Sequence, residues 1–206
     1  MEMAFLQGFG LGGSLVVAVG AQNAFILKQG LKQSHPLLIA ALCSCIDALM
    51  ITFGVLGFGR VVVAFPVIIN VARIGGALFL FTYGAHALYM SFQHSRKLST
   101  DMKQVESIPR VLLLTLGLSL LNPSLYLDTV LLLGSISVQF QGVERVLFAV
   151  GAIMASLGWF FSLSFGTKYL SPAFNQPQAW VYLDRAICLI MWSIALILMA
   201  PYILAS

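Results

Sequence analysis

The chain has 206 residues, of which 60% are hydrophobic and 9% are charged, and its mean hydropathy is +0.96. Soluble domains carry roughly 25% charged residues, so this composition excludes a water-soluble globular protein and indicates an integral membrane protein. The net charge of +4 is too small to indicate a nucleic-acid partner. It fits an excess of basic residues in cytoplasmic loops.

Six apolar segments follow one another along the chain, at about 4–27, 36–58, 66–91, 111–135, 144–166 and 179–203. Each has the roughly 20 residues that a helix needs to cross a bilayer core about 30 Å thick. The first residues, Met1-Glu2-Met3, lack the basic region of a secretory signal, so we expect the first segment to be retained. The sequence therefore predicts an all-α, polytopic membrane protein with six transmembrane helices in a single domain over residues 1–206.

Basic residues are distributed unevenly between the loops. The loops after even-numbered segments hold only Arg60 and Arg145, whereas seven basic residues follow the odd-numbered segments. The positive-inside rule therefore predicts a cytoplasmic loop at 92–110 and both termini outside. If the first segment is not a full span, the N-terminus lies inside and the rest is unchanged. The seven are Lys28, Lys32, Arg96, Lys97, Lys103, Arg110 and Lys168.

The polar linker 92–110 divides the chain into halves of three segments each, about 1–91 and 111–206. An odd number of spans makes the second half enter from the opposite side of the membrane. Related halves would then form an inverted repeat, a plan common in secondary transporters. Polar residues interrupt the first segment of each half, and Arg73 and Arg185 lie at similar depths in the third segments. We therefore predict a 3+3 inverted repeat joined by a cytoplasmic linker.

The fourth segment contains Asn122-Pro123 in its middle. Proline removes a backbone donor, and a capping side chain followed by proline is also typical of a helix start. One interpretation is a span broken at Asn122, whose second half presents free N–H groups and a positive dipole end. The alternative is a tolerated kink, because proline is common in membrane helices.

Two carboxylates lie within apolar segments. Asp47 is in the middle of the second segment, and Asp128 follows Asn122 by six residues in the fourth. Charged groups at this depth are costly and usually serve a transport pathway. Because the two acids come from different halves, they predict one central site. The alternative for each is a structural hydrogen bond or a pair within the helix bundle.

Arg73 lies about two turns into the third segment. It either reaches back to the membrane interface, pairs with one of the two aspartates, or binds a carboxylate of a ligand. Asp184 and Arg185 lie nearer a membrane edge and are expected to form an interfacial or capping pair.

Gln22 and Asn23 lie among glycine and alanine near the end of the first segment. Amides in this setting either join helices or contact a ligand. The cysteines are odd in number and lie in apolar runs, so we expect packing rather than a disulfide framework; they are Cys43, Cys45 and Cys188.

Four elements stand out together: Gly20-x-Gln22-Asn23, Asp47, Arg73-Ile74-Gly75-Gly76-Ala77 followed by Tyr83-Gly84, and Leu121-Asn122-Pro123-x-x-Tyr126-Leu127-Asp128. Together they resemble the lysine/arginine exporter (LysE) family of bacterial inner-membrane transporters, over essentially the whole chain. The resemblance implies a transporter, not an enzyme, that exports amino acids, with lysine and arginine favoured over the neutral substrates of the threonine/homoserine branch. It also implies a multi-pass protein of the bacterial inner membrane, driven by a proton or ion gradient.

A basic amino acid suggests how such a site would work. Two buried carboxylates suit its cationic groups, and the N–H groups of a helix start suit its carboxylate. Exchange of the substrate cation for a proton on the same carboxylate would cancel the electrical cost of export, about 2.3 kcal/mol per 100 mV. We expect the substrate site to include Asp47, Asp128, Asn122, Pro123, Gln22, Asn23, Arg73 and Tyr126.

Two other functions remain open on the sequence alone. The first is an exporter of neutral amino acids or cations on the same scaffold. The second is a membrane thiol oxidoreductase that relies on the cysteines. We expect no cofactor and no metal, because the sequence shows no phosphate-binding loop and no cluster with metal-ligand spacing. Glycine-rich spans allow a homodimer.

Overall fold

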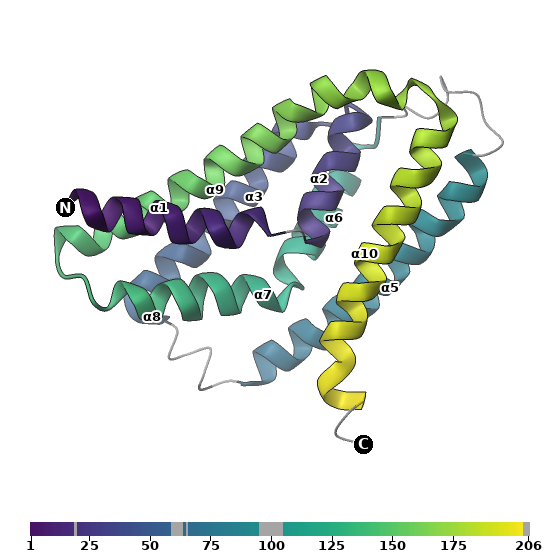
Figure 1. The fold of residues 1–206 in the computed structure, drawn as a ribbon. Helices are drawn as coiled ribbons and strands as arrows, with labels where there is room; N and C mark the ends of the chain where they lie inside the picture. The colour runs from purple at the N-terminus through teal and green to yellow at the C-terminus, as the bar shows by residue number, and fades with distance from the viewer. Residues whose placement is uncertain (19, 59–63, 65, 95–104, 204–206) are drawn as a thin grey trace.

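A computed structural model describes residues 1–18, 20–58, 64, 66–94 and 105–203. The basic residues Arg60, Arg96, Lys97 and Lys103 of the topology prediction lie outside this range. The described residues form helices and no strands, with seven helices of more than ten residues (Figure 1). These are α1 (Glu2–Val17), α2 (Ala21–Leu31), α3 (Pro36–Phe53), α5 (Pro66–His94), α6 (Ile108–Leu120), α9 (Val143–Leu170) and α10 (Pro177–Ile203).

Short segments continue or join these helices. Gly54–Phe58 (η1) and Tyr126–Leu133 (η3) have the wider π-helical turn, and Ser171–Asn175 (η4) is a 3-10 turn between α9 and α10. The fourth apolar segment resumes after α6 as α7 (Pro123–Leu125), η3 and α8 (Gly134–Ser137).

Within the described part of the chain, four stretches are each long and apolar enough to cross a membrane, namely Pro36–Gly57, Ile69–Gln93, Val143–Phe174 and Gln178–Tyr202. The first and fourth predicted segments are instead bent pairs of helices. The axes of Glu2–Val17 and Ala21–Leu31 differ by 74°, and those of Ile108–Leu120 and Pro123–Ser137 by 59°. The prediction of an all-α polytopic membrane protein is confirmed, with six spans if each bent pair counts as one.

The bent pair α1–α2 joins opposite ends of the molecule. The N-terminal amine of Met1 lies 3.1 Å from the Glu144 Oε1 atom at the start of α9. Just after α2, the Lys32 Nζ atom lies 3.0 Å from Glu106 Oε1, which precedes α6. The pair therefore runs from one end to the other rather than returning as a loop. We call the end near Glu106 the linker end, because it adjoins the linker 92–110.

The two halves meet through corresponding spans. The third and sixth spans, α5 and α10, run antiparallel along each other (Figure 1). The Tyr202 hydroxyl donates to Asn70 Oδ1 at one end of this pair, at 3.0 Å, and the rings of Phe81 and Trp192 stack further along it. The second and fifth spans, α3 and α9, also pack together. Such pairing is what a two-fold axis in the membrane plane requires; the repeat itself stays a prediction.

Of the three clusters of buried apolar side chains among the described residues, two hold the body of the bundle together, and the third joins Leu31 to Trp180. The larger includes Phe25, Phe160 and Met191 and lies toward the linker end. The smaller surrounds Phe148 and Leu133. Burial of apolar surface cannot drive helices together within lipid, so close packing must do so. A side-chain carbon added at Gly12 of α1 would lie 2.8 Å from the Ala152 Cα atom of α9, which shows how closely these helices approach.

Candidate functional site

The break in the fourth span is capped on both sides. Helix α6 ends at Leu120, and Asn122 is extended, with its Oδ1 atom accepting a hydrogen bond from the Ser124 N–H at 3.1 Å. Pro123 takes the first helical position, where its missing N–H costs nothing. The Tyr126 hydroxyl donates to the Leu120 carbonyl at 2.7 Å. The predicted break at Asn122 is confirmed, and its polar groups stabilise the break itself.

The break in the first span is built differently. Gly20 is extended before α2, and no side chain caps the start of that helix. Instead, the Asn23 amide reaches back and donates to the carbonyls of Val16 and Ala18, at 3.0 and 2.9 Å. The Trp159 indole N–H of α9 donates to Asn23 Oδ1 at 3.3 Å. Asn23 therefore closes the end of α1, and its amide is fully used.

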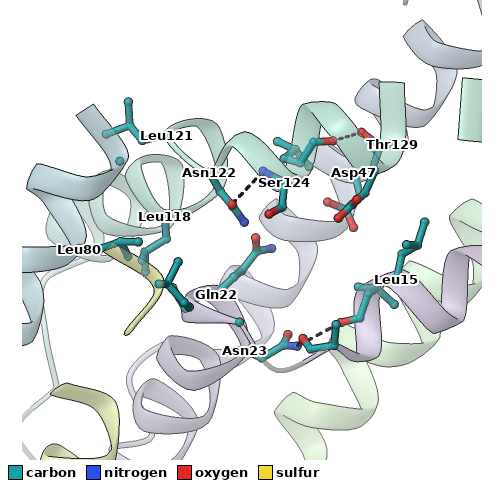
Figure 2. A pocket seen from close by; sticks show the side chains of 18 of the residues that line it. Leu15, Gln22, Asn23, Asp47, Leu80, Leu118, Leu121, Asn122, Ser124 and Thr129 are labelled. Atoms are coloured by element: carbon teal, nitrogen blue, oxygen red, sulfur yellow. Dashed lines mark hydrogen bonds between the residues drawn. The ribbon is translucent and has the colours of Figure 1, made fainter. Parts of the chain in front are cut away.

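Gln22, one residue earlier, has an amide nitrogen that is not used in this way. Its Nε2 atom is buried without a hydrogen-bond partner in the described part of the chain. The backbone N–H groups of the first turn of α2 also lack intrahelical acceptors, because the first helical bond runs from the Ala24 N–H to the Gly20 carbonyl. In Figure 2 the Gln22 side chain points toward that of Asn122.

Both breaks face one cavity of about 310 Å³. This volume is at the lower end of the range of small-molecule sites, roughly 300–1,000 Å³. The wall is mostly apolar and draws residues from both apolar clusters, so the cavity lies between them. Its polar lining comes from Gln22, Asn23, Asp47, Asn122, Ser124 and Thr129, which Figure 2 labels, and from Gly20 and Asp128.

The two carboxylates reach this cavity from opposite halves of the chain. Asp47, on α3, is 7% exposed and accepts a hydrogen bond from the Ser156 hydroxyl of α9 at 2.7 Å. Asp128, on η3, is half-buried. Neither takes part in any ion pair found among the described residues. An unpaired carboxylate within a membrane is costly, so the cavity is suited to a cation.

Three predicted site residues do not line the cavity. Pro123 is buried behind the break, and Tyr126 is held by the Leu120 carbonyl. Arg73, on α5, is partly buried and is outside the cavity wall. The ion pairs of the described residues do not join Arg73 to Asp47 or Asp128.

The comparison with known families bears on what this cavity does. Residues 13–201 match the family described as LysE type translocator. This chain belongs to that family. Among its relatives is a protein of Aeromonas salmonicida named "Putative amino-acid transporter YggA", 41% identical over 98% of both chains. Proteins named arginine exporter protein ArgO from Pectobacterium carotovorum and Yersinia enterocolitica are each 34% identical over 95% of this chain and 96% and 95% of theirs. No solved structure matches significantly.

Membership of the LysE family confirms the resemblance seen in the sequence. The chain is a membrane transporter of the amino-acid exporter type and not an enzyme. The thiol oxidoreductase considered above is therefore wrong. The three cysteines are free, with Cys43 and Cys188 buried, as packing side chains would be.

One pair of charged residues in this LysE-family chain was placed wrongly. Asp184 is fully buried, and its Oδ1 atom lies 2.6 Å from the Nζ atom of Lys28, itself almost fully buried. Its carboxylate is therefore in the interior and not at the interface, whereas the Arg185 side chain is exposed. Lys28 was assigned to a loop because hydropathy falls there, yet α2 continues to Leu31. Ser156 and Trp159, which support the site from α9, had no sequence signal beyond their place in an apolar segment.

Proposed function

We propose that this chain exports basic amino acids, L-arginine or L-lysine or both, from the cytoplasm across the bacterial inner membrane. The observation that carries the proposal is the meeting of Asp47 and Asp128, from opposite halves of the chain, at one cavity. The relatives named arginine exporters support the same cargo. A neutral amino acid has only its α-ammonium group to offer, so one of the two carboxylates would have no cationic partner.

The start of α2 offers the best binding groups for the substrate carboxylate. The second break offers little, because the Ser124 and Leu125 N–H groups already donate to Asn122. The start of α2 has an open first turn, and the Gln22 amide lies beside it. Helix starts of this kind bind anionic groups in other transporters. The substrate would therefore lie with its carboxylate at Gln22 and its cationic groups toward Asp47 and Asp128.

Proton exchange completes the proposed mechanism. Moving a cation out of the cell works against the membrane potential, at about 2.3 kcal/mol per 100 mV. If the same carboxylates carry the substrate outward and a proton inward, the protein is an antiporter and this electrical cost cancels. One chain supplies the whole cavity lining described above, so a homodimer is compatible with this mechanism but is not required by it.

The test is efflux of labelled amino acids from cells fed the matching dipeptides, with and without the protein. We expect faster efflux of arginine or lysine and no change for a neutral amino acid. In Asp47→Asn or Asp128→Asn, efflux should fall about 30-fold or more, because loss of one partner of a buried charge pair costs about 2–5 kcal/mol and 1.4 kcal/mol is tenfold.

Glu144→Gln, an exposed change in the first turn of α9, is the matched control and should export normally. Full-rate arginine efflux by a correctly inserted Asp47→Asn or Asp128→Asn variant would remove the carboxylates from the mechanism. Faster efflux of neutral amino acids alone would favour the other branch of the family. In proteoliposomes, export that ignores an imposed pH gradient would contradict proton exchange.

A further inference from the structure

A buried ion pair lies between the cavity and the linker end. The Lys28 Nζ atom, in the last turn of α2, is 2.6 Å from Asp184 Oδ1 on α10, and the two side chains are 7% and 0% exposed. Both helices also reach the cavity, α2 through Gln22 and α10 through Ile194. The pair therefore joins two elements of the cavity wall at a place outside the cavity itself.

The pair and an aromatic layer lie in sequence along α2, between the cavity and the linker end. Lys28 is six residues beyond Gln22, about 9 Å along the helix at 1.5 Å per residue. Phe25 lies between them on α2, fully buried, and its ring contacts that of Tyr83 edge to face, with centroids 6.0 Å apart. A substrate that moved along α2 from the linker end to the cavity would meet first the ion pair and then this aromatic layer.

Further charges lead from solvent to the pair. Glu106, just before α6, lies 3.0 Å from Lys32 and 3.6 Å from Arg110, and its backbone N–H donates to Ser34. Burial raises the pKa of Glu106, but the neighbouring cations outweigh burial and hold the pKa below its ordinary value. Side-chain exposure falls from 56% at Arg110 to 16% at Glu106 and 0% at Asp184. The linker end thus holds alternating charges that become more buried inward.

Stability does not explain a buried pair of this kind. Well-packed apolar side chains in place of a buried ion pair are often neutral or stabilising, whereas loss of one partner alone leaves a costly unpaired charge. The pair can therefore open only when both members gain new partners together. A zwitterionic basic amino acid supplies both partners at once, a carboxylate for Lys28 and a cationic group for Asp184.

We propose that Lys28 and Asp184 form a second binding site, an inner access site for a zwitterionic basic amino acid. The substrate opens the pair by exchange of ionic partners and then passes Phe25 to the cavity. The inference rests on the proposed function for its cargo. It adds a site that acts before the cavity, on the cytoplasmic side if the linker 92–110 is cytoplasmic.

The decisive experiment is uptake of labelled arginine by inside-out membrane vesicles, which sets the concentration at the linker end. The variant Lys28→Met/Asp184→Leu keeps the packing and removes both charges. We expect its KM for arginine to rise at least tenfold, with normal insertion and thermal stability in detergent. The swap Lys28→Asp/Asp184→Lys keeps a pair but reverses its direction, and its KM should rise as well. The control Asn70→Leu/Tyr202→Phe removes a polar contact at the opposite end of α10 and should leave KM unchanged.

Wild-type KM and maximal rate in either inserted Lys28/Asp184 variant would overturn the proposal. If neither variant inserts, the native protein decides by hydrogen exchange of the α2 segment Phe25–Leu31. Arginine should speed that exchange and valine should not, and equal exchange with both would contradict the site. Absence of arginine transport by the wild-type protein would instead contradict the proposed function, so the two failures are distinguishable.

Discussion

The two broken spans satisfy the free backbone groups at their breaks in opposite ways. At the second break, Asn122 and Pro123 cap the start of α7, and the Tyr126 hydroxyl binds the last carbonyl of α6. At the first break, the Asn23 amide binds the last carbonyls of α1, and the start of α2 has no side-chain cap. The second break is therefore satisfied by its own residues, whereas the first leaves N–H groups without an acceptor among the described residues. Two breaks that face one cavity thus differ in which of their polar groups remain available.

The largest effect should come from a negative charge at the open break. Gln22→Glu would set a carboxylate against the substrate carboxylate, and like charges brought together cost several kcal/mol. We expect arginine export to fall about 100-fold, at about 1.4 kcal/mol per tenfold, with normal insertion. Export rates at equal protein amounts in the membrane measure this.

The same isosteric change at the other break is the matched control. Asn122→Asp keeps a good helix cap, because Asp and Asn are about equal at this position. Its carboxylate would still accept the Ser124 N–H, which offsets part of its charge, so export should stay within about tenfold of the wild type, which corresponds to 1.4 kcal/mol. Equal losses in Gln22→Glu and Asn122→Asp would mean that the two breaks share the anion-binding task.

A smaller effect concerns stability, which should fall more in Asn23→Ala than in Asn122→Ala. Asn23→Ala removes three hydrogen bonds. Side-chain hydrogen bonds in membrane proteins average about 0.6 kcal/mol each, so the loss is about 2 kcal/mol. Asn122→Ala removes one cap, worth about 1 kcal/mol. Unfolding in mixed micelles measures both values. A smaller loss in Asn23→Ala than in Asn122→Ala would reverse our assignment of structural roles.

The sequence predicted the second break better than the first, for a physical reason. Asn-Pro carries its signal locally, since the cap and the proline both act on the turn that follows them. Gly20-x-Gln22-Asn23 has no such local meaning. Asn23 acts on residues five and seven positions earlier, and it does so only because the chain bends there. Which of the two adjacent amides keeps an unpaired N–H group could therefore be read only from the structure.

The ion pair between Lys28 and Asp184 could not be predicted from the sequence for a related reason. The spans and both aspartates followed from hydropathy and from the cost of charge in a membrane. The partner of Asp184, however, lies on α2, far away in sequence. Hydropathy placed Lys28 in a loop, because a buried ion pair and a loop both lower the local average. A charge near the end of an apolar segment cannot be assigned to either without its neighbours in space.

The smallest effect on stability and export should come from Pro123, although a proline within an apolar segment was a prominent feature of the sequence. Pro123 is buried and does not line the cavity. Alanine at the first helical position gains an N–H that a helix start leaves unpaired in any case, and the Asn122 cap on Ser124 is kept. We expect Pro123→Ala to change stability by less than about 1 kcal/mol, the worth of one cap, and to export at close to the normal rate. A loss of export larger than that of Asn122→Ala would show that proline itself, rather than the capping asparagine, sets the direction of the half-helix. In that event the backbone geometry set by Pro123 would hold the Asp128 carboxylate in its place. The two breaks would then differ in rigidity.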